Sequence, residues 1–492
     1  MARQFPRLVL AGLRGGSGKT LLALGLASYL RKEGFKVSPF KKGPDFIDAG
    51  WLALAAGREC HNLDPFLMTD TQIIEAFLSN SADTDISLIE GNRGLFDGVD
   101  LNGSCSTARL GRLLKAPTIL IVDVTMATRT MAAMVMGCQH FEPDVQIEGV
   151  ILNRVAGSRQ EALVRSSIER YCGIPVVGSV PKLKGNFFPE RHMGLVPHQE
   201  RRDAIKAIEW AQEAVREGID LKAMWRIAHH AVPLKQDIRQ RAEEPLQIPN
   251  AHTAPRIGYI RDSSFWFYYP ENLDQLKDLG AELVEVNSLT DREVPALDAL
   301  YIGGGFPETQ AKALSDNRAF RASLRKKIEE GLPVYAECGG LIYLGEALIV
   351  NGNTYPMVGA IPLQMVLEEK PQGHGYTVLE VTKQNPFYAV GEILKGHEFH
   401  YTRAIIKESE GIELVFKVHR GYGIDGEKDG VYKGNLLATY SHMHARGTPR
   451  WGEGLFRAAL QSKNRGTLAF LTGSHKGIEN GKNFRYEIGA KS

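Results

Sequence analysis

The residues best suited to chemistry near the start of this chain form the run 12–20, Gly-Leu-Arg-Gly-Gly-Ser-Gly-Lys-Thr. Glycines allow backbone N–H groups to turn toward a phosphate, Lys19 can reach the β- and γ-phosphates, and the hydroxyl of Thr20 can hold Mg²⁺. The glycines that we expect to contact the nucleotide are Gly15, Gly16 and Gly18. We therefore predict an ATP-binding phosphate loop.

The flanking sequence supports this prediction. Residues 7–11 are an apolar run that predicts a buried strand, and 20–32 carry leucines at the spacing of one helix face. A strand, a glycine loop and a helix are the context that a phosphate loop requires, because the helix N-terminus adds partial positive charge. A glycine-rich turn without a ligand is the alternative, and it leaves this context unexplained.

Three carboxylates follow predicted strands, at the edge where ligands bind in open α/β sheets. They are Asp45, Asp48 and Glu90. Carboxylates that face a triphosphate repel it unless a cation intervenes, so we predict that they hold Mg²⁺ together with Thr20. A role as loop caps or surface charges is the alternative for one or two of them.

Two further side chains near this edge have less specific predictions. Lys41 or its neighbour Lys42 could neutralise the charge of a transferring phosphoryl group. Asn153, at the end of another predicted strand, could read the nucleotide base or simply cap a loop.

A second group with chemical potential lies near Cys338. This cysteine follows a predicted strand and precedes two glycines, which permit the sharp turn of a nucleophile elbow. His442 is the first candidate for its base and His444 the second. Backbone N–H groups of Gly339 and of the loop 303–305 could form an oxyanion hole, and a helix beginning after Cys338 would lower the pKa of the thiol.

The elements around these residues predict an α/β protein. Apolar runs at 36–40, 86–90, 118–123, 149–153 and 175–180 alternate with helical patterns, which indicates a parallel, doubly wound sheet. A second α/β unit begins at 256–260 and continues with a helix near 271–276 and strands at 299–302 and 332–336. The last third is richer in turns and short extended segments.

Domain boundaries follow from these patterns. We predict an ATP- and substrate-binding domain over 1–227, a linker over 228–255, a second α/β domain over 256–465 and a tail over 466–492. The linker has prolines, paired histidines and clustered charges that interrupt periodicity.

Composition limits the function classes. The 492 residues have a formal net charge of +2, which favours neither nucleic acid nor a membrane surface as a partner. No apolar run reaches the length of a membrane-spanning helix, and the first predicted strand leaves no room for a signal peptide. The five scattered cysteines lack C-x-x-C spacing and fit a reducing cytoplasm.

Two motif sets carry a family resemblance. Residues 14–20 resemble the deviant phosphate loop of dethiobiotin synthetase and the MinD/ParA ATPases, although Leu13 stands where the usual loop has glycine. Residues 335–341, Tyr-Ala-Glu-Cys-Gly-Gly-Leu, with the loop 303–308 and His442, resemble a class I glutamine amidotransferase domain of the cobyric acid synthase type. The segments 41–48, 62–64 and 90–98 resemble cobyrinic acid a,c-diamide synthase, and the likeness covers essentially the whole chain.

The resemblance implies a fold and a reaction. It implies a dethiobiotin synthetase/MinD-like phosphate-loop domain followed by a class I amidotransferase α/β domain. The expected reaction uses ATP, Mg²⁺ and glutamine to amidate two carboxylates of a corrinoid, through an acyl phosphate. Cys338 would be the nucleophile, His442 its base, and Asp97 would face the acceptor. The oligomeric state, a homodimer included, stays open.

Two departures from the family pattern bear on these expectations. His444 stands where class I amidotransferases often have glutamate, so the group that orients His442 is open. Asn92 and Arg93 stand where the family often has apolar residues. Arg93 favours an acceptor with several carboxylates, because guanidinium binds carboxylate bidentately, although a surface salt bridge would also explain it.

Three alternatives to this function remain at the level of sequence. Sirohaem or nickel-sirohydrochlorin could be the acceptor in the same chemistry. The chain could instead be a MinD/ParA-like ATPase switch fused to an inactive amidotransferase module. Another glutamine-dependent ligase, such as a CTP synthase, would need loops different from 43–45.

Overall fold

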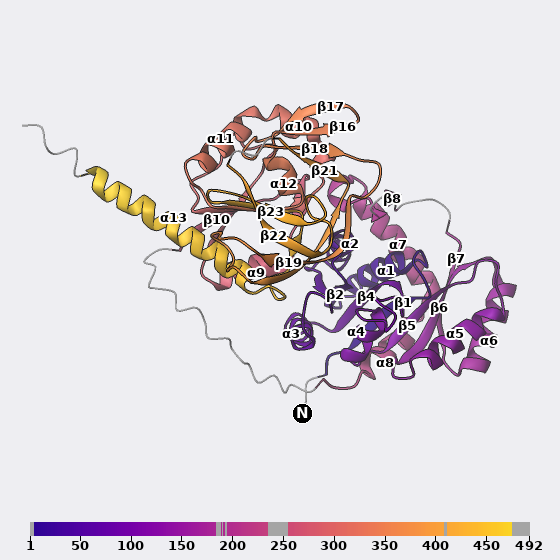
Figure 1. Cartoon of the computed structure of the whole chain (residues 1–492). Coiled ribbons are helices and arrows are strands. Elements are labelled where there is room, and N and C mark those ends of the chain that lie inside the picture. The colour runs from indigo at the N-terminus through magenta and orange to yellow at the C-terminus, as the bar shows by residue number, and fades with distance from the viewer. Residues whose placement is uncertain are drawn as a thin grey trace, which may run out of the picture.

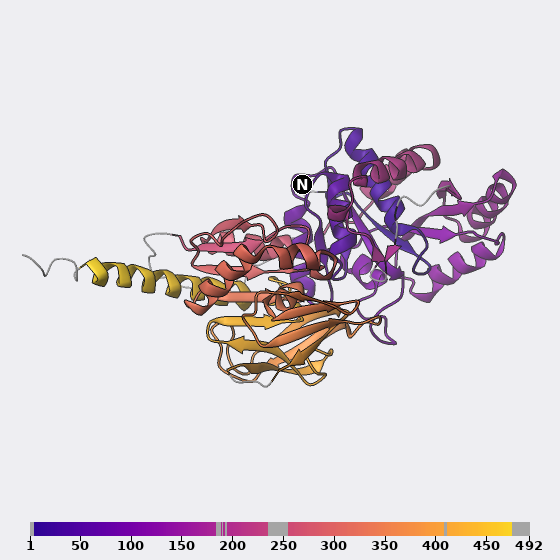
Figure 2. The same cartoon turned by 90° about the horizontal axis from the view of Figure 1, so that it is seen from above.

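The computed structural model of this chain describes residues 4–183, 188, 190–191, 194–234, 254–407 and 411–474. They form two α/β domains that lie side by side (Figures 1 and 2). Most of the predicted linker and most of the predicted tail lie outside the described residues. The predicted domain boundaries therefore stay predictions.

The N-terminal domain is built on a sheet of seven parallel strands in the order β3-β2-β4-β1-β5-β6-β7. This confirms the predicted doubly wound parallel sheet. The strands are β1 (Arg7–Gly12), β2 (Val37–Lys42), β3 (His61–Leu63), β4 (Ile86–Gly94), β5 (Thr118–Asp123), β6 (Ile147–Val155) and β7 (Val176–Pro181).

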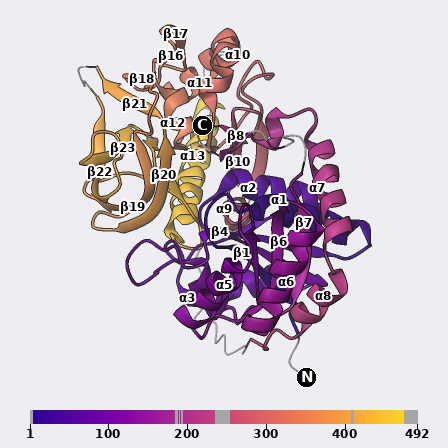
Figure 3. The ribbon, with the colours of Figure 1, turned by 90° about the vertical axis from the view of Figure 1, so that its right-hand side faces the viewer.

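Helices cover both faces of this sheet (Figure 3). One apolar core lies under α1 (Lys19–Lys32), α2 (Phe46–Ala56), α7 (Ala204–Gly218) and α8 (Leu221–His229). The other lies under α3 (Asp70–Asn80), α4 (Thr107–Leu113), α5 (Thr130–Phe141) and α6 (Ser158–Cys172). Between α6 and α7 lie a two-stranded ribbon, β8 (Glu190–Arg191) and β9 (Gly194–Leu195), and the short helix η1 (His198–Glu200).

The C-terminal domain has a ten-stranded mixed sheet in the order β12-β10-β13-β15-β24-β23-β22-β19-β20-β25. Its first five strands are parallel and the others are antiparallel. The parallel strands are β12 (Glu282–Val286), β10 (Arg256–Ile260), β13 (Ala299–Ile302), β15 (Val334–Glu337) and β24 (Leu436–Thr439). The antiparallel strands are β23 (Lys428–Lys433), β22 (Glu413–Arg420), β19 (Gly373–Val381), β20 (Ile393–His400) and β25 (His442–Met443).

Smaller elements complete this domain. A four-stranded sheet contains β17 (Asn353–Pro356), β16 (Ala347–Val350), β18 (Leu363–Leu367) and β21 (Thr402–Ile406), and a ribbon pairs β11 (Phe265–Phe267) with β14 (Gly304–Gly305). The helices are α9 (Pro270–Asp278), η2 (Pro307–Gln310), α10 (Ala311–Asp316), α11 (Arg318–Glu329), α12 (Gly339–Leu344) and α13 (Arg450–Ser474). Helix α13 projects away from the N-terminal domain (Figure 2).

Aromatic stacking and hydrogen bonds join the two domains. The ring of Phe46, at the start of α2, stacks on Phe267 of β11 with centroids 4.8 Å apart. Phe66 stacks on Tyr376 of β19, and the hydroxyl of Tyr376 donates to Asp64 over 3.0 Å. The segments that follow β2 and β3 thus pack against β11 and β19 of the C-terminal domain. In the part of the chain that the structure describes, no helix is long and apolar enough to cross a membrane.

Candidate active site

The predicted phosphate loop joins β1 to α1. Gly16 and Gly18 have φ angles of 71° and 88°, in the left-handed region that glycine adopts without strain. The ammonium of Lys19 donates to the carbonyl of Arg14 over 3.3 Å, and the hydroxyl of Ser17 donates to the same carbonyl over 2.8 Å. These bonds hold the loop in a closed turn at the helix N-terminus, as an anion-binding loop requires.

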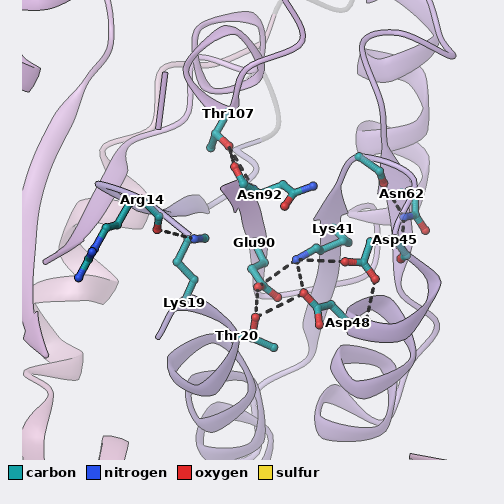
Figure 4. Close-up of polar contacts among 11 residues, drawn as sticks. Arg14, Lys19, Thr20, Lys41, Asp45, Asp48, Asn62, Glu90, Asn92 and Thr107 are labelled. Atoms are coloured by element: carbon teal, nitrogen blue, oxygen red, sulfur yellow. Dashed lines mark hydrogen bonds and ion pairs between the residues drawn. The ribbon is translucent and has the colours of Figure 1, made fainter. Parts of the chain in front are cut away.

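The three predicted carboxylates converge beside this loop, and Lys41 lies among them (Figure 4). Its Nζ lies 2.6 Å from Asp48 Oδ2, 3.0 Å from Glu90 Oε1 and 3.9 Å from Asp45 Oδ2. The register of β2 against β4 places Lys41 directly opposite Glu90. The hydroxyl of Thr20 donates to Glu90 Oε1 over 2.6 Å.

These groups change one another's pKa values. Burial alone would lower the pKa of Lys41, but the negative charges of Asp48 and Glu90 outweigh burial and raise it. Desolvation and the neighbouring charge of Asp48 raise the pKa of Asp45 to about 7. Burial also raises the pKa of Glu90, although Lys41 opposes this shift. The ammonium of Lys41 is therefore what keeps this acidic cluster stable.

The donor set suits Mg²⁺, which prefers carboxylate and hydroxyl oxygens. Glu90 Oε2 is buried and has no hydrogen-bond partner among the described residues, so it is available to a cation. Within the described residues, no group of three His, Cys, Asp or Glu side chains is already arranged as a metal cage. The side chain of Lys41 takes the position between the carboxylates, and it competes with a cation for the same oxygens.

The remaining residues predicted for this domain lie close to the loop or to the domain interface. Asn153 Nδ2 donates to the carbonyl of Ser17 over 2.9 Å, so its amide supports the phosphate loop. The predicted contact of Asn153 with the nucleotide base stays a prediction. Asp97 Oδ2 accepts the backbone N–H of Gly94 over 2.8 Å, and Arg93 has a positive φ of 51°. Asp97 and Arg93 both line a cavity between the domains.

Cys338 occupies a strained turn between β15 and α12. Its φ and ψ are 46° and −100°, a conformation that is costly for a non-glycine residue and typical of a nucleophile elbow. Its backbone N–H donates to the carbonyl of Thr439 on the neighbouring strand over 2.7 Å. A side chain at Gly340 would lie 2.5 Å from the carbonyl of Ile302, so the turn requires glycine there.

The expected lowering of the thiol pKa is wrong for this structure. Burial and the negative charge of Glu308 raise the pKa of Cys338, and the backbone N–H of Gly339 offsets them only in part. Helix α12 has only six residues, so its dipole is small.

His442 and His444 face different partners. Nδ1 of His442 lies 3.6 Å from Oε2 of Glu337, the residue before the cysteine. Glu337 is itself held by the hydroxyl of Tyr301 over 3.0 Å and by the backbone N–H of Met443 over 3.1 Å. Position 444, where class I amidotransferases often have a glutamate, is a histidine in this chain. Glu337 is thus the carboxylate placed to orient His442.

The partner of His444 is an interdomain acid. Its Nε2 lies 3.7 Å from Glu271 Oε2, and Glu271 Oε1 lies 2.8 Å from Nδ1 of His61 on β3. Burial lowers the pKa of His444 to about 4. Because it faces the interface rather than Glu337, His444 is the weaker candidate for the base.

A cavity of about 530 Å³ joins the two groups of residues. Asp45, Arg93 and Asp97 line it from the N-terminal domain, and His397 and His442 line it from the C-terminal domain. The rings of His397 and His442 stack with centroids 4.8 Å apart. The cavity therefore has Asp45 of the carboxylate cluster on one side and the candidate base His442 on the other.

Sequence reasoning assigned no role to Phe46, Glu337 or His397. Phe46 directly follows Asp45 and packs against His442, with centroids 5.3 Å apart. Glu337 could have been suspected because it is the acid adjacent to the nucleophile. The roles of Phe46 and His397 depend on how the domains meet, which no local pattern reveals.

Comparisons with known proteins agree with this arrangement. Residues 8–196 match the family of CobQ/CobB/MinD/ParA nucleotide binding domains, and residues 256–449 match CobB/CobQ-like glutamine amidotransferase domains. The chain is 42% identical to a "Cobyrinate a,c-diamide synthase" of Magnetococcus marinus, over 93% of this chain and 98% of the relative. Proteins with the same description from Archaeoglobus fulgidus (41% identity, 89% of this chain and 94% of the relative) and Listeria innocua (37%, 89% and 96%) are also similar.

Proposed function

Because this chain belongs to the cobyrinate a,c-diamide synthase family, we propose that it uses ATP and glutamine to amidate the a and c side-chain carboxylates of cobyrinate. The observation that carries this proposal is the interdomain cavity, which Asp45 of the nucleotide side and His442 of the amidotransferase side both line. A ligase of this kind must bring an activated carboxylate and ammonia together, and the cavity is the space between the domains where they could react.

In the N-terminal domain, the γ-phosphoryl group of ATP passes to an acceptor carboxylate and forms an acyl phosphate and ADP. The backbone of the phosphate loop binds the phosphates, and Lys19 and Lys41 supply positive charge to the transferring group. Thr20, Asp48 and Glu90 would hold Mg²⁺, with Asp45 nearby. When bound, this ion neutralises charge on the β- and γ-phosphates.

In the C-terminal domain, the sulfur of Cys338 attacks the side-chain amide of glutamine. His442 takes the thiol proton and returns it to the departing nitrogen, so that ammonia and a thioester form. Glu337 orients the imidazole of His442. Water then hydrolyses the thioester to glutamate and restores the thiol.

Ammonia completes the reaction by attacking the carbonyl carbon of the acyl phosphate. The C–O bond to phosphate breaks, phosphate leaves with the bonding electrons, and loss of a proton gives the amide. Because His442 and Asp45 line the same cavity, we infer that ammonia crosses this space between the domains to reach the acyl phosphate. The scattered free cysteines are compatible with a cytoplasmic enzyme.

The test is to supply purified protein with ATP, Mg²⁺ and glutamine and with cobyrinic acid, sirohaem or nickel-sirohydrochlorin as the acceptor. Mass spectrometry follows the replacement of each OH by NH₂. We expect two successive amidations of cobyrinic acid. Turnover of sirohaem or nickel-sirohydrochlorin without turnover of cobyrinic acid would overturn the acceptor, and turnover of none would overturn the tetrapyrrole assignment.

A further inference from the structure

Three cationic side chains line the interdomain cavity and come from both domains. Lys42 ends β2, Arg93 lies near the end of β4, and Arg420 ends β22 of the amidotransferase domain. In the parts of the chain that the structure describes, none of them lies within 4.0 Å of a carboxylate oxygen in an ion pair.

Lys42 is the most informative of the three, because its side chain is largely covered, with the residue only 6% exposed, and its ammonium makes no hydrogen bond to any described residue. Burial lowers its pKa. The preceding residue, Lys41, has three carboxylates around its ammonium. The ammonium of Lys42 faces the cavity and has no carboxylate within ion-pair distance among the described residues, so it is open to an anion that enters there.

The acids near this cavity use their oxygens for other hydrogen bonds and form no direct ion pair with these cations. Asp97 accepts the N–H of Gly94, and Glu398 accepts two backbone N–H groups. Asp64, which attracts Lys42 from a distance, accepts two backbone N–H groups and the hydroxyl of Tyr376. The hydrogen-bond donors of the three cations are therefore not used by these acids.

Arg420 is placed by a contact between the domains. Its guanidinium lies over the ring of Phe66, 5.2 Å from the centroid, and Phe66 stacks on Tyr376 with centroids 4.2 Å apart. Residues of the N-terminal domain thus position an arginine of the amidotransferase domain at the mouth of the shared cavity. Its fork of N–H donors remains available for a carboxylate.

We propose that Lys42, Arg93 and Arg420 form a carboxylate-binding subsite that holds acid arms of the acceptor other than the arm being amidated. This inference rests on the proposed function and deepens it, since it makes the amidotransferase domain part of the acceptor site. A polyanionic acceptor would then bind to both domains at once. The carboxylate to be activated could lie toward Asp45 while its neighbours contact the three cations.

The first test is Arg420→Gln, with Lys417→Ala as the matched control. Lys417 is an exposed cation on the same strand that does not line the cavity. Arg420→Gln should raise KM for the acceptor about 10- to 100-fold, the value of one or two charge-assisted hydrogen bonds. KM for glutamine should stay at the wild-type value in Arg420→Gln, and Lys417→Ala should have the wild-type KM for both substrates. An unchanged acceptor KM in Arg420→Gln would overturn the subsite.

A second probe changes the acceptor instead of the protein. An acceptor whose non-reacting arms are methyl esters removes the negative charges that the subsite would bind. The wild type should bind this ester less well than the free acid, and Arg420→Gln should discriminate between the two acceptors less than the wild type does. Equal discrimination by both proteins would contradict contact between Arg420 and the acid arms.

Lys42→Met separates binding from structure. Removal of an ammonium that has no ion pair should leave Tm of the protein without ligand unchanged or higher, while KM for the acceptor rises. If Lys42 instead serves a structural pair with Asp64, Tm will fall. Failure of the wild type to amidate any tetrapyrrole acid would refute the proposed function, whereas wild-type turnover with unaffected variants would refute only this subsite.

Discussion

The two reaction centres of this chain differ in how their polar groups are paired. Beside the phosphate loop, Lys41 contacts three carboxylates and Thr20 donates to Glu90. At the elbow, Nδ1 of His442 has no hydrogen bond to any described residue, and Cys338 has a strained backbone and a raised pKa.

This difference shows what each centre needs from its ligand. In the nucleotide centre, which is the site beside the phosphate loop, the ammonium of Lys41 compensates the negative charges of the carboxylates. A cation and a triphosphate must therefore replace existing contacts of Lys41. In the thiol centre, the proton acceptor is present but incompletely bonded, so substrate must complete the arrangement. Mutations should therefore separate the two centres cleanly, and the predictions below run from the largest expected effect to the smallest.

Cys338→Ala should abolish glutamine-dependent amidation, by about 10⁴-fold or more, because it removes the nucleophile. Amidation with ammonium chloride should persist, since the nucleotide centre lies in the other domain. The measurement is the rate of amide formation with each nitrogen source, and Cys138→Ala, in α5, is the control. Equal loss with both sources would mean that the centres are not separable.

Glu90→Gln should lower amidation about 100-fold or more with either nitrogen source, because the transferring phosphoryl group loses several kcal/mol of electrostatic stabilisation. Glutamine hydrolysis at Cys338 should remain measurable. Glu148→Gln, an exposed acid on β6, should behave as the wild type. If Glu90→Gln lost only the glutamine-dependent turnover, Glu90 would serve glutamine hydrolysis and its assignment to the nucleotide site would be contradicted.

Glu337→Gln sharpens the assignment within the thiol centre. We expect glutaminase kcat to fall about 100-fold, with ammonia-dependent amidation retained, because the base loses the carboxylate that orients it. The amide can preserve the contacts of Glu337 with Tyr301 and Met443. Glu346→Gln, at a half-buried acid of the same domain that pairs with Lys407, is the control. A change confined to KM for glutamine would argue against the orienting role.

The smallest expected effect is a change in the stability of the folded chain, measured as Tm of Asp45→Asn. The pKa of Asp45 is about 7 in the folded chain and 3.8 ordinarily, so between these pH values the unfolded chain loses a proton that the folded chain keeps. Ionisation of Asp45 thus costs stability increasingly as pH rises, and fully above pH 7.

The variant removes this cost and can still accept the backbone N–H of Asp48 at the start of α2. Its Tm should equal that of the wild type near pH 4 and exceed it by about 2–4 °C at pH 8. A difference that stays constant with pH would contradict the raised pKa of Asp45.

The sequence predicted those parts of the fold that local patterns determine. Buried parallel strands are continuous apolar runs, so β1, β4 and β5 were predicted within a few residues. Strand β3 was missed because it has three residues, two of them polar. The last third was predicted as short extended segments, whereas β19, β20 and β22 have eight or nine residues, because turns and charged residues interrupt their alternation.

The candidate site was predictable to the extent that it follows strand ends. Asp45, Asp48 and Glu90 converge because β2 and β4 are neighbours in a parallel sheet. The place of Lys41 among them depends on the pairing register, and the contact of Glu337 with His442 depends on a strand pair far along the chain. The thiol pKa was predicted wrongly because burial, which no motif encodes, outweighs a short helix.

The most direct test of the central claim, that the two centres share one cavity, is an isotope competition. The enzyme is given ATP, Mg²⁺, cobyrinic acid and amide-¹⁵N glutamine in the presence of excess unlabelled ammonium, and the ¹⁵N content of the product amides is measured. We expect amides that are predominantly labelled, because ammonia released from glutamine at Cys338 would pass to the acyl phosphate through the cavity between the domains. Labelling equal to that of the bulk ammonia pool would contradict it.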